Sequence, residues 1–377
     1  MNNVIFLLTW RRSPKIGVFN QQLQTTLANA LDLNLARLKC LALLIAATMK
    51  HRSVNLVQLA TTDDGRTCSN ESRYRRFQDF FLRTKLCFSS VSKLILQRIP
   101  KPKNGYLLAL DRTNWEFGHQ TINFLVLAII IGKVSIPITW KVLPKKSKGG
   151  NSNQKQRITL MKRLLKIIPA KDIQVLTMDR EFVGKEWLSW LDEQGLIYVV
   201  RIKKNTAVGW RSAQEYASLP GKKSPAKQDI FGLHLFFGSG PMKGSQKEKI
   251  MVVSNHLSGK EALKVYRKRW GIERLFGHLK RKGFDLEATH MTCPKKLEKL
   301  FAIVVIAFTY SFGWGCHLRS QGDRSSAQSK RKSLFRLGLE DLVNMFDLSF
   351  SNGRRKRDQH RFKRWLNSPG EPSIFLV

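Results

Sequence analysis

The chain has 377 residues, of which 42% are hydrophobic and 10% aromatic, so a disordered chain is excluded and two or three domains are expected. It carries 66 Lys and Arg against 27 Asp and Glu, a formal net charge of +39. Such a surplus predicts a polyanionic partner, and nucleic acid is favoured over an anionic membrane surface.

The first hundred residues are predicted to form a helical DNA-binding region. The N-terminal apolar run is too short, and its charges are in the wrong order, for a signal peptide. Residues 22–50 carry apolar side chains at helical spacing, with no Gly or Pro among them. Shorter helical segments at 53–60 and 72–83 follow between turn-rich stretches. Together these segments predict a small helical bundle.

A basic cluster marks the last of these helices. Arg73, Arg75 and Arg76 flank Tyr74, which makes the helix a candidate for a DNA contact of helix-turn-helix type. An ordinary helical domain with a solvated basic face explains the same cluster. The sequence leaves both interpretations open.

After a linker with Pro and Gly at residues 99–105, the pattern changes to strands and helices in alternation. Three strands, a helix, a strand, a helix and a strand are predicted at residues 106–111, 122–132, 135–144, 155–168, 172–179, 183–195 and 196–204. This order predicts an α/β domain over residues 105–290. Residues 205–257 are predicted to be a β-rich insertion, and helical spacing returns over residues 259–282.

Residues 291–377 are predicted to be a helical, basic C-terminal region. Residues 300–318 are long and apolar enough to cross a membrane, but their polar residues and a Gly-Trp-Gly interruption favour a buried core helix. A short helix is expected at 334–346, followed by the basic run 354–365. That run is either a mobile DNA-binding tail or a solvated charge cluster.

Five cysteines contain no CxxC pair, which argues against a disulfide framework and against a cysteine-based zinc site. This usage fits a reducing cytosol. We therefore expect a cytoplasmic protein that is not associated with a membrane.

Two carboxylates close predicted strands. Asp111 ends the strand at 106–111, and Asp179 ends the strand at 172–179. Asp often ends a strand as a turn or cap residue, so either one alone has an ordinary structural explanation. As a pair, they are candidates for a site at one edge of the sheet.

A third acid lies on the helix predicted at 259–282. Tyr266, Arg269, Glu273 and Lys280 fall within a stripe about 60° wide at about 100° per residue, so one helix face presents an acid with a phenol and two cations. Arg269 and Glu273 are four residues apart, so an exposed helix with ion pairs is the simpler explanation of this stripe taken alone.

Three motifs together resemble bacterial DDE transposases of the insertion-sequence-four family. They are LDRTNWEFG around Asp111, LTMDREFVG around Asp179, and the signature Y-x2-R-x3-E-x6-K from Tyr266 to Lys280. The resemblance covers roughly residues 106–282. It implies a ribonuclease-H-like domain in which the first two acids lie on neighbouring strands and the third on a following helix. A β-rich insertion between the second and third acids is also implied.

The resemblance implies that Asp111, Asp179 and Glu273 are catalytic residues that bind two Mg²⁺ ions, for which Mn²⁺ can substitute. Phosphodiester cleavage needs a deprotonated oxygen nucleophile and relief of charge on the leaving oxygen, and divalent cations held by carboxylates meet both needs. The implied reaction is a nick at each transposon end, a hairpin, its reopening, and joining to target DNA. The residues implied to contact DNA phosphates are Tyr266, Arg269 and Lys280.

The implied partners are transposon-end and target DNA, bound by a homodimer that is associated with the bacterial nucleoid. In hairpin-forming relatives an aromatic of the insertion stacks on a flipped base, and Trp210, Phe236 and Phe237 are candidates among which no motif selects. Two rival functions remain. One is a nuclease of the same fold without strand transfer, and the other is a DNA-binding relic without catalysis.

Overall fold

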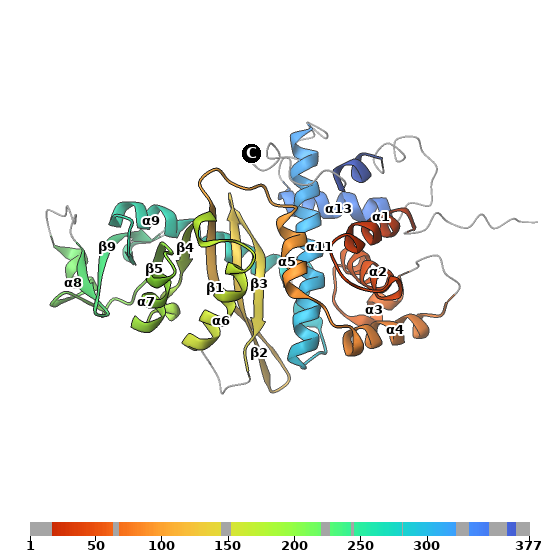
Figure 1. Ribbon diagram of the computed structural model, residues 1–377, viewed down its shortest axis with the longest axis horizontal. Helices are drawn as coiled ribbons and strands as arrows, with labels where there is room; N and C mark the ends of the chain where they lie inside the picture. Colours follow the sequence, from red (N-terminus) through yellow and green to blue (C-terminus); the bar gives the residue numbers. More distant parts are fainter. Residues whose placement is uncertain are drawn as a thin grey trace, which may run out of the picture.

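The computed structural model describes residues 17–62, 68–144, 152–219, 227–242, 245–280, 282–321, 332–346 and 360–366. Along the longest axis of the molecule, a β-rich end, a central sheet and a helical end follow one another (Figure 1). The long helix α11 (Pro294–Ser320) stands between the sheet and the helical end (Figure 1).

The helical end begins with five helices: α1 (Gly17–Ala28), α2 (Leu35–His51), α3 (Leu56–Ala60), α4 (Asn70–Arg83) and α5 (Phe88–Leu96). The prediction of one helical run over 22–50 is wrong, because the chain turns between α1 and α2. Asn34 starts α2 as its N-cap, and its side chain accepts a hydrogen bond of 2.9 Å from the backbone N–H of Arg37. This N-cap stabilises the start of a new helix at Leu35, a signal that apolar spacing alone does not carry.

The central sheet confirms the predicted α/β order. Its strands are β1 (Tyr106–Phe117), β2 (Gln120–Ile131), β3 (Val134–Val142), β4 (Ile173–Met178) and β5 (Tyr198–Arg201), and its helices are α6 (Gln154–Leu165) and α7 (Lys185–Glu193). Strands β1, β2 and β3 pair antiparallel, whereas β4 pairs parallel with both β1 and β5. This mixed sheet is consistent with a ribonuclease-H-like domain.

The segment predicted as a β-rich insertion is rich in strands. It contains β6 (Ala207–Val208), β7 (Arg211–Ser212), α8 (Ala213–Ser218), β8 (Gln228–Ile230), β9 (Leu233–Met242) and β10 (Ser245–Ser254). Strand β10 pairs antiparallel with β5, which gives one sheet in the order β3-β2-β1-β4-β5-β10-β9-β8. The insertion therefore extends the central sheet.

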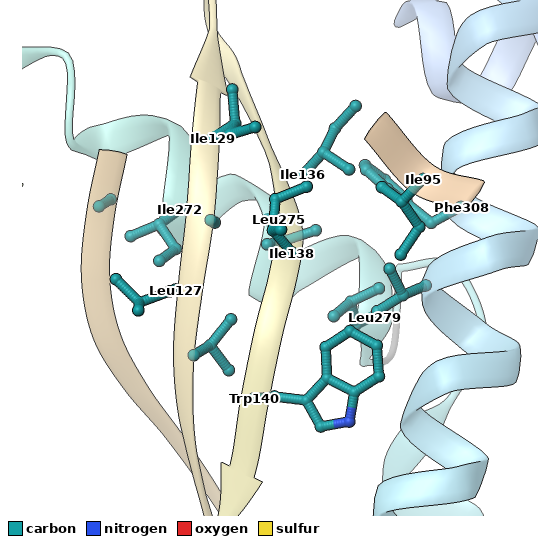
Figure 2. Close-up of a cluster of buried hydrophobic side chains, with 14 of the residues drawn as sticks. Ile95, Leu127, Ile129, Ile136, Ile138, Trp140, Ile272, Leu275, Leu279 and Phe308 are labelled. Carbon is teal, nitrogen blue, oxygen red and sulfur yellow. The ribbon is translucent and has the colours of Figure 1, made fainter. Parts of the chain in front are cut away.

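The single helix predicted over 259–282 is also wrong, because two helices form: α9 (Gly259–Arg267) and α10 (Trp270–Leu279). Helix α10 lies against the sheet. Figure 2 shows Ile272, Leu275 and Leu279 of α10 among apolar side chains of β2 and β3. The approach is close, since a Cβ on Gly271 would stand 2.9 Å from the Ser135 hydroxyl. This packing fixes the helix that carries Glu273.

Helix α11 has the length and composition of a membrane span, but 94% of its apolar window is buried inside the protein. The expected core helix is thus confirmed. Helices α2, α4 and α5 pack against it from the N-terminal part, and α13 (Leu334–Phe346) packs against it from the C-terminal part. The N- and C-terminal regions therefore share one helix as their core.

The C-terminal basic run is described only from residue 360, and residues 354–359 lie outside the described part. Residues 360–366 are helical, and Phe362 and Trp365 are buried against Trp314 of α11, with ring centroids 5.0 and 5.6 Å away. Arg98 donates hydrogen bonds to the carbonyls of Trp365 and Leu366. The described half of the run is therefore docked, neither a mobile tail nor a purely solvated cluster. All five cysteines lie within the described residues and are free thiols.

Candidate active site

The first two acids are brought together by strand pairing. Leu110 of β1 is in parallel register with Met178 of β4, so the next residue on each strand is an acid, Asp111 and Asp179. Parallel pairing places consecutive residues of both strands at the same level of the sheet. Asp111 does not end its strand as predicted, since β1 continues to Phe117.

Arg269 links Asp111 of β1 to Glu273 of α10. It stands at the turn between α9 and α10, where its backbone N–H donates to the Tyr266 carbonyl at 2.9 Å. Its Nη1 donates to Asp111 Oδ2 at 2.6 Å, and its Nη2 donates to Glu273 Oε1 at 2.9 Å. Arg269 is only 6% exposed, so its guanidinium is an internal bridge between the two carboxylates.

The second acid, Asp179, has its own partners. The Tyr266 hydroxyl donates to Asp179 Oδ1 at 3.1 Å, and the Arg269 guanidinium lies over the Tyr266 ring, 5.4 Å from its centroid. Arg201, at the end of β5, stands 3.8 Å from Asp179. The sequence analysis missed Arg201, and only its place at the end of a predicted strand next to β4 signalled it. Asp111, Asp179 and Glu273 thus belong to one network.

Burial shapes the protonation of this network. It raises the pKa of Asp111 to about 6, although Arg269 and the N–H of Arg112 oppose the shift. It also raises the pKa of Tyr266 to about 12, so the phenol keeps its proton. Burial opposes the charge of Arg269, but Tyr266 and the surrounding carboxylates raise its pKa above the ordinary value. The network therefore holds a permanent cation.

A second ion pair fixes the two strands beside the acids. Arg112 of β1 pairs with Glu181, just after Asp179, at 3.0 Å, with both side chains 18% exposed. Arg157 of α6 donates to the backbone carbonyl of Glu181 at 2.9 Å. The structure gives Glu181 a partner 69 residues away, which local spacing cannot reveal.

Lys280 does not share a helix face with the other signature residues. It follows the end of α10, with φ −87° and ψ −140°, so the angular stripe calculated for one helix does not apply to it. Its ammonium donates to the Asn114 carbonyl at 2.6 Å and pairs with Glu287 at 3.3 Å. Lys280 therefore lies along β1, three residues beyond Asp111.

The donor set has the chemistry of a divalent-cation site, because three carboxylates supply hard oxygen ligands. Asp111 and Glu273 already face the same cationic group. In the part of the chain that the structure describes, however, no three His, Cys, Asp or Glu side chains are grouped closely enough to hold an ion as they stand. Arg269 and Tyr266 take the carboxylate oxygens that would bind one.

The three arginines of the basic cluster on α4 differ in burial. Arg73 is 3% exposed and donates to the Ala60 carbonyl at 2.6 Å, so it joins α4 to α3. Arg75 is exposed and pairs with Glu71 at 2.9 Å, one turn earlier. Arg76 is half-buried against Cys68. The placement of Arg73 does not support the predicted DNA contact, whereas that of Arg75 leaves the contact open.

The insertion aromatics also differ. Trp210 is 84% exposed in the turn between β6 and β7, with the Arg211 guanidinium 3.9 Å from the centroid of its ring. Phe237 is buried, and Lys227 lies over the half-buried Phe236. Trp210 alone among these three aromatics presents an open ring surface.

The fold and the site define an α/β catalytic domain with two acids on adjacent parallel strands and a third on a following helix, consistent with a metal-dependent enzyme that cuts DNA. A family model described as Transposase DDE domain matches residues 103–310, and the chain belongs to this family. The matched region begins before β1 and ends within α11, so it includes all three acids. A comparison with curated proteins found no match. Membership supports a DDE-type transposase that acts on DNA, and such enzymes generally use divalent metal ions.

Proposed function

We propose that this protein is a cut-and-paste transposase of the insertion-sequence-four family, which cleaves and joins DNA at the ends of its own element. One observation carries the proposal. Asp111, Asp179 and Glu273 come from three separate elements, and Arg269 and Tyr266 join them in one network. All five residues lie within the matched transposase domain.

Asp111, Asp179 and Glu273 would together hold two Mg²⁺ ions, or Mn²⁺ in their place. When bound, the ions activate the oxygen nucleophile and relieve charge on the leaving oxygen. For this to happen, Arg269 must release Asp111 and Glu273, which it now bridges.

A released Arg269 remains charged and can donate two parallel hydrogen bonds to a phosphate. Tyr266 keeps its proton and can donate to a phosphate once it leaves Asp179. Lys280 donates to the Asn114 carbonyl of β1, three residues beyond Asp111. From there its ammonium can contact a phosphate of the DNA strand that passes the acids. These residues therefore position the DNA, and the carboxylates carry the chemistry.

In this proposal the new 3′-OH attacks the opposite strand to form a hairpin, which is reopened before the end is joined to target DNA. An exposed aromatic that stacks on an unpaired base favours such a sharp bend in the strand. Trp210 is the best placed of the three candidates, because its ring is open to solvent.

Recognition of the ends is assigned to the helical region over residues 20–98, since cleavage itself reads no sequence. Arg75, which is exposed on α4, and Arg76 are the candidates for contacts with DNA. The active form is proposed to be a homodimer bound to DNA in the bacterial cytoplasm. The high net charge of the chain supports nonspecific affinity along any DNA.

The test is to incubate the purified protein with Mg²⁺ and DNA that carries the ends of its element. Nicks, hairpins and joined products are expected. Cleavage without hairpins or joining would identify the alternative function, a nuclease of the same fold. Binding without cleavage would identify a DNA-binding relic. No cleavage and no binding would contradict the proposal entirely.

A further inference from the structure

A second cationic site lies where the three parts of the chain meet. A pocket of about 720 Å³ is lined by Arg52 at the end of α2, by residues at the end of α10, and by the first turns of α13. Arg52 belongs to the N-terminal helices, α10 carries Glu273, and α13 belongs to the C-terminal region. We name this the three-part pocket. Its lining residues are Arg52, His278, Lys282, Lys332, Ser333, Phe335, Arg336 and Leu339.

The charge of the three-part pocket is unbalanced. Its lining contains four cations, and the only carboxylate paired with them among the described residues is Glu340. Glu340 accepts from Lys332 at 2.6 Å and from Arg336 at 2.8 Å, and it is 4.0 Å from Arg52. The ammonium of Lys282 is exposed and has no acidic partner in the described part of the chain. Four cations against one acid leave an excess of about three positive charges to be neutralised by a ligand.

The rest of the pocket suits a phosphate and a flat ring. Ser333 caps α13, and its hydroxyl accepts from the backbone N–H of Arg336, so the positive end of a 13-residue helix opens at the pocket. Phe335 is buried beneath, and the His278 ring lies against it with centroids 4.8 Å apart. The Nδ1 atom of His278 is buried without a hydrogen-bond partner. The pocket thus offers donors and an aromatic floor.

We propose that the three-part pocket binds the sugar-phosphate backbone of the DNA that is being processed, with Lys282, Lys332 and Arg336 as its phosphate contacts. This proposal rests on the proposed function. His278 is five residues after Glu273 on α10, about 8 Å along the helix axis, which equals the rise of two or three nucleotides of one strand. One stretch of DNA can therefore reach both the acids and the pocket.

Such a site has a consequence for the assembly of the enzyme. Because Arg52, Lys282 and Arg336 come from different parts of the chain, a single bound backbone holds the N-terminal helices, the catalytic domain and α13 together. The intramolecular ion pairs of Glu340 already join α13 to Arg52. The DNA would add an ionic link to Lys282 beside the ring contact that already joins His278 of α10 to Phe335 of α13.

The experiment measures the binding of end DNA over a series of salt concentrations, in EDTA so that no cleavage occurs. Lys282→Gln removes a charge without breaking an ion pair in the described structure. We expect several-fold weaker binding at about 0.15 M salt, and a slope of log K against log salt that is smaller in magnitude by about 0.9. Lys162→Gln is the matched control, because Lys162 is exposed on α6 and lines no part of the pocket. It should leave the slope unchanged.

The contact is read out directly by acetylating the lysines of the full-length protein with a water-soluble reagent. Mass spectrometry then measures the acetylation of each lysine. Bound DNA should protect Lys282 and leave Lys162 reactive. If DNA binds but Lys282 stays as reactive as in the free protein and the slope of Lys282→Gln equals that of wild type, the pocket proposal is overturned and the proposed function stands. If the wild-type protein binds no DNA, both fail. If inorganic phosphate protects Lys282 from acetylation and end DNA does not, the pocket is a site for small anions, and the assignment to DNA is overturned.

Discussion

The central sheet offered a pair of acids and the N-terminal helices a cluster of arginines, and the two sets of side chains are arranged differently in the structure. In the sheet, Asp111 and Asp179 are adjacent because a parallel ladder fixes their level. On α4, three arginines that are neighbours in sequence separate into a buried, a half-buried and an exposed side chain. Pairing of strands gathers residues that are distant in sequence, whereas neighbours along a helix point to different faces.

This difference shows which sequence motif reliably predicts a site in the structure. The acids are constrained at both ends, by the strand register on one side and by Arg269 on the other. On α4, only the buried Arg73 is held by another helix, through the Ala60 carbonyl of α3, whereas the exposed Arg75 pairs with Glu71 of its own helix. Function in the sheet should therefore fail abruptly on single substitutions, and function on α4 should decline in small steps.

The largest effect is expected for Asp111→Asn. The variant keeps the shape of the side chain but loses the charge that metal binding needs, so cleavage should fall by more than the roughly 10–100-fold typical of residues that only support metal ligands. Binding of DNA should persist, because removal of a carboxylate does not weaken phosphate contacts. Gel assays of cleavage and binding on the same DNA measure both.

Asp172→Asn is the matched control for that variant. Asp172 stands just before β4, at the end of the strand away from Asp179, and pairs with Lys101 at 3.0 Å. Cleavage by this control should remain near that of wild type. Equal loss in both variants would mean that Asp111 acts through stability and not through the site.

The next effect concerns the helix that carries Glu273. Leu275 is fully buried between α10 and the sheet, and Leu275→Ala should lower the free energy of unfolding by about 2–5 kcal/mol. Leu188→Ala on α7 should cost a similar amount, because Leu188 is equally buried. Cleavage at a temperature where both variants stay folded should suffer more in Leu275→Ala. Equal cleavage by the two variants would show that the position of α10 does not matter for the site.

A third effect separates structure from recognition on α4. Arg73→Gln should lower the free energy of unfolding by about 1–3 kcal/mol, because it removes the donors for the carbonyls of Ala60 and Cys68. Thermal or denaturant unfolding measures the loss. Unchanged stability would show that the buried guanidinium is dispensable, and would return Arg73 to the candidates for contacting DNA.

The smallest effect is expected for Arg75→Gln. Arg75 is exposed, so its loss should barely change stability, while binding to the ends of the element should weaken a few-fold through one lost phosphate or base contact. Binding to end DNA and to unrelated DNA distinguishes the cases. A loss confined to end DNA supports recognition by α4, whereas no loss on either DNA excludes Arg75 from the interface.

Point variants are needed here because the N-terminal helices cannot simply be removed. Helices α2, α4 and α5 pack on α11, and Lys299 of α11 donates to the Phe81 carbonyl of α4 at 2.7 Å. A protein without residues 1–98 would expose this apolar helix. Loss of end preference in such a truncation would therefore report unfolding as readily as recognition.

Much of the sheet could be predicted because strand patterning is local. The strands, the helices between them and the acids at 111 and 179 all follow from apolar runs and their ends. The breaks at Asn34 and Arg269 could not be predicted from spacing, since the apolar period continues across both. As a result, the angular stripe through Tyr266 and Lys280 assumed one helix where there are two.

The hydrogen-bond partners within the site could not be predicted from the sequence for another reason. Arg269 pairs with an acid 158 residues away, and Arg112 pairs with Glu181 at a separation of 69. Arg269 was predicted to contact phosphate, and its burial between carboxylates depends on tertiary packing that no spacing rule describes. The motif identified the residues, and only the fold shows which of them touch.

The most direct test uses calorimetry to measure the binding of Mn²⁺ to the protein in complex with end DNA. Asp111→Asn, Asp179→Asn and Glu273→Gln should each weaken Mn²⁺ binding at least tenfold, although the three acids lie on β1, directly after β4 and on helix α10. Asp172→Asn should bind as wild type does. If Glu273→Gln binds Mn²⁺ as tightly as the wild-type protein, the helix acid is not part of the metal site, and the central claim of one three-acid site is wrong.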